Sequence, residues 1–435
     1  MIKNVLPLSF IVATRFFGLF IVLPVLSLYA LNLDGADEKL VGFLIGIYAF
    51  MQMALQTPFG ILSDKIGRKN ALAIGLLIFI IGSIICAYSS GIYTMIFGRC
   101  LQGCGAVGAV ATALISDFTK EEERGKAMSI MGAMIGIAFA SAIVLSPILS
   151  DKFGLSSIFN LSAFLTLICL ILLYAVVPKE PKITTKSVKT PFSEILKDKN
   201  LLLLNLSNFL QKMLMTTAFF IIPIILVNNL GFDKSQIYKI YITAMIFGLV
   251  AMGLSGALGE KRGLAKEILL SGIAFFIASY ALFATENSLS IFVIAVILFF
   301  IGFNMHEPIM QSLASKFAKS HQKGSALGVF NSFGFLGSFV GGVFGGIALK
   351  EIGLFYLALV VVVLAVIWFI LLLNLTNPII FKNLYFDKSI KADFTALSDT
   401  HGIIECYETE KNFIVKYNRK RISKHQILKK LGLTR

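Results

Sequence analysis

Long uncharged runs of hydrophobic residues, separated by short charged connections, follow one another along most of the chain. A helix that crosses a bilayer needs roughly 20 mostly apolar residues. Twelve runs of about this length can be placed. They cover residues 5–31, 40–61, 71–88, 92–116, 126–149, 155–177, 200–229, 236–258, 267–285, 290–315, 324–349 and 354–375. The pattern therefore predicts an all-α membrane protein with twelve spanning helices.

The composition agrees with a polytopic membrane protein and excludes a water-soluble globule. Of the 435 residues, 57% are hydrophobic and 14% charged, and the mean hydropathy is +0.84. The net charge of +15 could suggest nucleic acid, but Lys and Arg lie in connections and in the C-terminal tail. We therefore expect the lipid bilayer as a partner and no nucleic acid. The N-terminus has no small-residue cleavage site, so we interpret it as the first helix.

Basic residues gather in every second connection. The linker 178–200, with six lysines, lies on one side of the membrane. The basic loop residues on the same side are Lys65, Arg68, Lys69, Lys120, Arg124, Lys126, Lys261, Arg262, Lys266, Lys316, Lys319 and Lys323. Positively charged loops stay in the cytoplasm. We expect a bacterial inner membrane protein with both termini in the cytoplasm.

The two halves of the chain repeat each other. The segment that begins Ser116-Asp117-Phe118 aligns without gaps on Ser315-Lys316-Phe317, and the same offset of 199 places Pro223 opposite Pro24. The repeat predicts two pseudo-symmetric six-helix bundles, 1–177 and 200–377, joined by a cytoplasmic linker, 178–199. In such folds a substrate site lies near mid-membrane between the bundles.

One charged connection carries a specific motif, Gly60-x-x-x-Asp64-Lys65-x-Gly67-Arg68-Lys69. Glycines allow close helix approach, a carboxylate can accept hydrogen bonds from a helix N-terminus, and basic residues favour the cytoplasmic side. The motif resembles the signature loop between the second and third helices of the major facilitator superfamily (MFS). A simple positive-inside anchor is the alternative interpretation.

The resemblance implies a conformational latch. Arg68 would pair with Asp117 at the end of the fourth helix, and Asp64 would face the start of the eleventh helix near Gly324 and Ser325. Such a latch would link the bundles and stabilise the outward-open state. The full latch set is Gly60, Asp64, Gly67, Arg68, Asp117 and Arg124.

Further motifs resemble those of the same superfamily. Arg99-x-x-Gln102-Gly103-x-Gly105 is similar to its fourth-helix motif, and Phe20 to Leu26 is similar to the first helix of drug–proton antiporters. Gly132-x-x-x-Gly136, followed by Pro147, resembles the fifth-helix antiporter motif and implies helix packing there. Ala140 replaces a usual glycine in that motif, which weakens the inference to antiport.

The tail, 378–435, is polar and has a different pattern. Alternating stretches at 381–386, 402–407 and 413–417 predict strands, and 388–397 and 423–431 predict short helices. The order β-α-β-β-α suggests a small α+β ferredoxin-like domain. It would sense a cytosolic ligand, dock on the core loops, mediate self-association or serve as a passive solubilising tail.

Few ionisable residues lie inside the apolar runs, and each costs at least ~2.5 kcal/mol at a helix centre. Glu307 is the only carboxyl deep in a helix. It either binds and releases a proton as its cationic partner changes or forms a permanent ion pair with Arg15 or Lys212. Arg99 either contacts substrate or helps pass a proton, or it is a brace tied to the backbone or to Gln52. The proton-coupling candidates are thus Glu307, Arg99 and Arg15.

Polar residues in the runs are candidates for the substrate cavity or for interhelical hydrogen bonds. They are Gln52, Gln56, Gln102, Asn208, Gln211, Asn304, His306 and Asn331. Cys100 and Cys104 lack further ligands, and the glycine run 334–346 lacks a P-loop lysine and indicates helix packing, so we expect no metal, nucleotide or other cofactor.

The sequence therefore predicts a transporter rather than an enzyme, driven by an ion gradient. The favoured hypothesis is proton-coupled export of small amphipathic or drug-like compounds by alternating access. Proton-coupled uptake of a small metabolite is one alternative. The other is a membrane sensor or scaffold that signals through its C-terminal domain.

Overall fold

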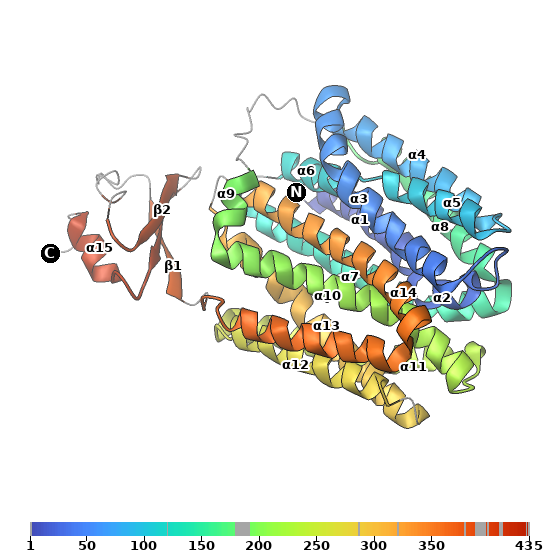
Figure 1. Ribbon diagram of the computed structural model, residues 1–435. Coiled ribbons are helices and arrows are strands. Elements are labelled where there is room, and N and C mark those ends of the chain that lie inside the picture. Colours follow the sequence, from blue (N-terminus) through green and yellow to red (C-terminus); the bar gives the residue numbers. More distant parts are fainter. Residues whose placement is uncertain are drawn as a thin grey trace.

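A computed structural model describes most of the chain, namely residues 2–119, 121–178, 192–285, 288–319, 322–377, 380–387, 397, 400–408, 412–431 and 433. Two helical halves lie side by side, and a small sheet lies beyond one end of them (Figure 1). We call this end, which carries the N-terminus, α9 (Phe192–Lys197) and the sheet, the linker end. The opposite end is called the far end.

The first half contains eight helical segments. They are α1 (Ile2–Phe20), α2 (Leu23–Ala30), α3 (Glu38–Ile66), α4 (Arg68–Ala87), α5 (Ile92–Cys104), α6 (Gly108–Asp117), α7 (Glu121–Phe153) and α8 (Leu155–Ala175). Asp37 caps α3 by accepting a hydrogen bond from the Leu40 amide at 2.8 Å. Gly67 has φ +93°, which allows the sharp turn from α3 into α4.

The second half contains α10 (Lys199–Ile224), a π-helical turn (Ile225–Asn229), a short 3₁₀ turn (Lys234–Gln236), α11 (Ile237–Lys261), α12 (Ala265–Phe283), α13 (Leu289–Phe317) and α14 (Lys323–Leu372). Within α14, Gly353 has the non-helical angles φ 75° and ψ 173°. The chain reverses at this point (Figure 1). The label α14 therefore covers two antiparallel helices that meet at Gly353.

Eleven helices among the described residues are long and apolar enough to cross a membrane. Two of the spans join consecutive segments, α1 with α2 and α5 with α6. Since α14 is divided at Gly353, the structure contains the twelve crossings that the hydrophobic pattern predicts.

Beyond the linker end lies a three-stranded antiparallel sheet of β1 (Phe381–Asp387), β2 (Ile403–Glu408) and β3 (Asn412–Asn418), in the order β1-β3-β2. The helix α15 (Lys424–Lys430) follows and begins with a capping box of Ser423 and Gln426. The three predicted strands are confirmed. The predicted helix at 388–397 lies outside the described residues, apart from Leu397.

Candidate transport pathway and its two ends

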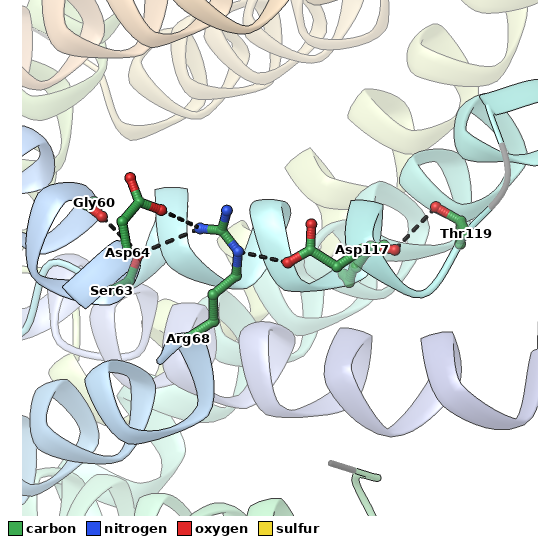
Figure 2. Close-up of polar contacts among 7 residues, drawn as sticks. Gly60, Ser63, Asp64, Arg68, Asp117 and Thr119 are labelled. Atoms are coloured by element: carbon green, nitrogen blue, oxygen red, sulfur yellow. Dashed lines mark hydrogen bonds and ion pairs between the residues drawn. The ribbon is translucent and has the colours of Figure 1, made fainter. Parts of the chain in front are cut away.

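At the linker end, Arg68 lies between two carboxylates (Figure 2). Its Nε donates to Asp117 Oδ2 at 2.5 Å, and its Nη1 lies 3.3 Å from Asp64 Oδ1 and 3.3 Å from Ser63 Oγ. Gly67 brings Arg68 to the first position of α4, from which the side chain reaches the end of α6. The predicted pairing of Arg68 with Asp117 is present.

Among the described residues, Asp64 makes no polar contact with the second bundle. The Asp64 side chain is 66% exposed. A Cβ added at Gly60 on α3, or at Gly324 on α14, would meet no atom within 4 Å. The expected position of Asp64 against Gly324 and Ser325 is therefore not observed, because the end of α3 and the start of α14 are apart at the linker end. The side chain of Arg124 lies outside the described residues.

At the far end, α3 and α14 are in backbone contact. A Cβ on Gly42 would lie 2.4 Å from the Gly342 carbonyl oxygen, and a Cβ on Gly346 would lie 2.3 Å from the Glu38 carbonyl oxygen. A Cβ on Gly46 would lie 2.7 Å from the carbonyl oxygen of Phe339. We call this contact the glycine seam. Because glycine has no side chain, it allows the two bundles to meet at van der Waals distance.

Two ion pairs extend the glycine seam at the surface. Lys350 Nζ donates to Asp37 Oδ2 at 2.6 Å, and Lys39 Nζ lies 2.5 Å from Glu351 Oε1. Each pair joins the start of α3 to the middle of α14. The hydrogen bond from Lys350 lowers the pKa of Asp37 below its ordinary value of 3.8. These partners lie more than 300 positions apart in the chain, and sequence reasoning did not find them.

Between the two ends, aromatic rings join the bundles. Phe20 of α1 packs edge-on against Phe139 of α7, with ring centroids 4.9 Å apart. Phe139 in turn lies 5.7 Å from Phe303 of α13, which stacks on Phe299 at 6.2 Å. We call Phe20, Phe139, Phe299 and Phe303 the aromatic layer. It lies on the far-end side of Glu307, which is one turn further along α13.

Glu307 forms an ion pair within the second bundle. Lys212 Nζ of α10 donates to Glu307 Oε1 at 2.5 Å, and Gln211 Nε2 donates to the same oxygen at 3.1 Å. The Glu307 and Lys212 side chains are 38% and 24% exposed. Lys212 Nζ also lies 4.9 Å from the ring centroid of Phe303. Of the two partners that the sequence allowed, the structure selects Lys212 and not Arg15.

Arg15 and Arg99 lie in the first bundle, apart from Glu307. Arg15 Nη2 donates to the Gly105 carbonyl at 2.6 Å, at the break between α5 and α6. Arg99 Nη1 donates to Gln102 Oε1 at 2.8 Å. Both guanidinium groups lie over the ring of Tyr48, with Cζ 5.9 Å and 4.8 Å from its centroid. The expected tie between Arg99 and Gln52 is not formed.

Most of the predicted cavity residues instead make interhelical hydrogen bonds or are fully buried. Gln52 donates to the Gly103 carbonyl, Gln102 to Ser83 Oγ, Asn208 to the Phe330 carbonyl and Gln211 to the Phe303 carbonyl. Asn304 donates within its own helix, to Phe300, and His306 is buried with Nε2 2.8 Å from the Leu269 carbonyl oxygen. Gln56 and Asn331 remain partly exposed. The amide groups thus mainly hold together the helices within each bundle.

The glycine predictions have different outcomes. The run 334–346 is a packing surface, as expected, since a Cβ on Gly337 or Gly341 would lie within 2.2 Å of a backbone carbonyl oxygen on α10. At Gly132 and Gly136 a Cβ would meet no atom of the described residues within 4 Å, so the helix packing expected there stays a prediction. These two glycines lie in the half of α7 toward the linker end, where the bundles are apart. Pro147 lies inside α7, nearer the far end.

The two bundles are in closer contact at the far end than at the linker end. The bundles meet at the glycine seam and the aromatic layer and separate toward the linker end, where the partly exposed pair of Glu307 and Lys212 lies. Among the described residues, no group of three or more His, Cys, Asp or Glu side chains is placed to hold a metal ion. Two pseudo-symmetric helical bundles around such a pathway define a secondary membrane transporter.

The chain belongs to the Major Facilitator Superfamily, whose family model matches residues 8–342 and, in an overlapping match, 204–382. It is 38% identical to the inner membrane transport protein YajR of Escherichia coli (strain K12) over 346 residues, which cover 78% of this chain and 76% of that protein. It is 26% identical to the quinolone resistance protein NorA of Staphylococcus aureus (strain COL), covering 79% of this chain and 89% of that protein.

Solved structures support the same fold. The crystal structure of a D-xylose–proton symporter aligns with a TM-score of 0.72 at 14% identity, covering 86% of this chain and 98% of that chain. The chain is thus a multi-pass membrane transporter rather than an enzyme.

Proposed function

We propose that the protein is a proton-coupled secondary transporter of the bacterial inner membrane that exports small amphipathic compounds. The observation that carries the proposal is the pair of Glu307 and Lys212, an ion pair at the bundle interface with both side chains partly exposed. Ionisable groups at membrane depth that face a pathway are usually functional. The proton is the cargo that a carboxylate in this position can bind.

The coupling follows from charge balance. While Glu307 is ionised, its charge is neutralised by Lys212 at 2.5 Å and by the hydrogen bond from Gln211. A proton on Glu307 removes the negative charge and leaves the ammonium group of Lys212 with the face of Phe303 as its remaining partner. Because Phe303 belongs to the aromatic layer, the change reaches the contact between the bundles. Proton binding and bundle movement are thereby linked.

The aromatic layer supports an amphipathic substrate. Phe20, Phe139, Phe299 and Phe303 offer ring faces and edges from both bundles, and such surfaces bind apolar bodies of varied shape. The similarity to a protein named for quinolone resistance also favours export of drug-like compounds. Export by exchange for protons is the direction we infer.

Orientation follows from the basic loops. The positive-inside pattern supports a cytoplasmic linker end, and then both termini and the C-terminal domain are cytoplasmic. The conformation described here would be inward-facing, with the glycine seam closing the periplasmic side. In the outward-facing form, Asp64 would approach the start of α14 and complete the latch. We propose domain limits of 1–177, 178–199, 200–377 and 378–435.

The C-terminal domain, which we propose to be ferredoxin-like, has two contacts that favour docking on the core. Lys416 Nζ of β3 donates to the Ala318 carbonyl at 3.1 Å, just beyond the end of α13, and the Phe381 ring lies 5.6 Å from that of Phe317. Burial lowers the pKa of Lys416, and Glu405 at 3.6 Å opposes that change. The docking links the domain to the helix that carries Glu307.

Transport in proteoliposomes with an imposed pH gradient tests the proposal, with a fluorescent quinolone as the probe. An acidic lumen should drive the quinolone inward as protons leave, whereas a symporter would require acid outside. Glu307→Gln should abolish the driven flux. Glu267→Gln, on the same bundle but in the first turn of α12, is the control and should retain it.

Quinolone flux that does not depend on the pH gradient would refute proton coupling. If a wider set of amphipathic probes showed no flux, and deletion of residues 378–435 altered the activity of another membrane protein, the sensor hypothesis would replace transport.

A further inference from the structure

The first bundle contains two buried positive charges that lack a negative partner. Arg99 is fully buried and Arg15 is 2% exposed. Their hydrogen bonds go to neutral acceptors, the amide oxygen of Gln102 and the carbonyl oxygen of Gly105. Among the described residues, no carboxylate pairs with either arginine. A guanidinium group does not lose its proton in proteins, so both charges persist inside the bundle.

The same place holds a cluster of unused hydrogen-bond donors. Twelve buried side-chain nitrogen and oxygen atoms have no partner among the described residues, and four of them are Arg15 Nε, Arg99 Nε, Arg99 Nη2 and Tyr48 Oη. The three side chains are in contact, because both guanidinium groups lie over the Tyr48 ring. Three of the four atoms are guanidinium nitrogens that only donate, and the fourth is a phenol that can donate.

A surplus of donors and positive charge in a buried place fits an anion. Buried charges are normally paired, and buried polar atoms are normally hydrogen-bonded. The cation–π contacts with Tyr48 compensate part of the charge, but they leave the N–H and O–H groups unused. An acceptor with a single negative charge can accept from the unused donors and neutralise one of the two positive charges.

We propose that the first bundle binds a small monovalent anion at Arg99 and the Tyr48 hydroxyl group, with Arg15 supplying the second positive charge. The ligand chemistry is that of a halide ion or a carboxylate group. This site is separate from Glu307, which lies on the other bundle with its own cation. The inference does not depend on the proposed proton coupling.

Equilibrium binding to the purified full-length protein tests the site. Melting temperature is measured during titration with sodium chloride, and in a parallel arm with sodium benzoate, each at ionic strength held constant with sodium sulfate, whose divalent anion lies outside the proposed ligand class. A saturable rise with chloride identifies a resident halide. A rise with benzoate alone identifies the carboxylate group of an organic ligand. If neither salt gives a saturable rise, the proposal is overturned.

Variants locate the site. Tyr48→Phe keeps the ring and removes only the hydroxyl group, and it should weaken the apparent affinity by about tenfold, the value of one hydrogen bond to a charged group. Arg99→Gln should abolish saturable binding. Lys239→Gln removes an exposed positive charge on α11 and should bind like the wild type.

Since Arg99→Gln could fail to fold, Tyr48→Phe is the decisive variant. If its affinity for chloride and benzoate equals that of the wild type, the anion does not bind at this site.

Discussion

The glycine seam allows a direct test of which end of the transporter is closed. A Cβ placed on Gly342 would lie 2.6 Å from the Gly42 carbonyl oxygen and 2.9 Å from the Gly46 amide nitrogen. Ordinary van der Waals contact begins at 3.4 Å. In Gly342→Ala, α3 and α14 must therefore move apart by several tenths of an ångström, and the closed far end loses stability.

The cost can be compared with that of overpacking a protein core, about 1–3 kcal/mol. When this cost falls only on the conformation with a closed far end, the population ratio shifts about 5- to 150-fold toward the open one. Alanine also favours the helix by about 1 kcal/mol relative to glycine. Gly328→Ala on the same helix gains that term as well, but its Cβ would meet no atom within 4 Å, so it is the matched control.

The assay is double electron–electron resonance between spin labels at Asp34 and Thr285, exposed far-end residues of the two bundles, in a background without the native cysteines. Gly342→Ala should add a longer distance, while Gly328→Ala should keep the wild-type distribution. The same distribution in both variants would refute the reasoning, because it would mean that the far end is not closed by this contact.

Four further predictions concern the polar contacts. Asp37→Lys should raise the population with an open far end by no more than a few fold, because the ion pair that it breaks is exposed. Adding Lys350→Asp should restore the wild-type label distances. Because Lys350 lowers the pKa of Asp37, the pair should support the closed far end at neutral pH and lose its contribution only as the pH falls below 3.8. Measuring the label distances at low pH checks this prediction. Asp117→Asn should reduce stability by about 1 kcal/mol, the difference between a charged and a neutral hydrogen bond, while Asp64→Asn leaves the melting temperature nearly unchanged because that carboxylate is mostly exposed. Lys416→Met keeps the buried stem and removes the hydrogen bond to the core, so the rate of amide hydrogen exchange in β3 should rise. An unchanged exchange rate would show that this contact does not hold the domain on the core.

The sequence was sufficient for the crossings and the bundle architecture because membrane thickness sets the length of each apolar run. It also predicted the pairing of Arg68 with Asp117, through a motif that fixes both residues. It could not choose between Arg15 and Lys212 as the partner of Glu307. That choice depends on which face of each helix meets its neighbour. Because these helices have apolar residues on every face, the hydrophobic pattern does not predict which face that is.

Other features depend on the conformation or on contacts between distant parts of the chain. Gly132 and Gly136 have the spacing of a packing surface, yet the bundles are apart on that side. The ion pairs of Asp37 and Lys39 with residues of α14 join positions more than 300 residues apart, and no local pattern marks such partners. The sequence could not decide between the cavity and interhelical hydrogen bonds for the amide side chains, because a polar side chain in an apolar run satisfies either role.

The most direct test of the central claim is the pH dependence of the far-end distance between the labels at Asp34 and Thr285 in lipid nanodiscs. In the wild type, lowering the pH from neutral to acidic should change the populations as Glu307 takes up a proton and releases Lys212. Glu307→Gln carries no titrating group there, so it should show one distribution from neutral pH down to 3.8, the range in which the pair of Asp37 and Lys350 keeps its contribution. If Glu307→Gln keeps the pH dependence of the wild type, Glu307 is not the proton site.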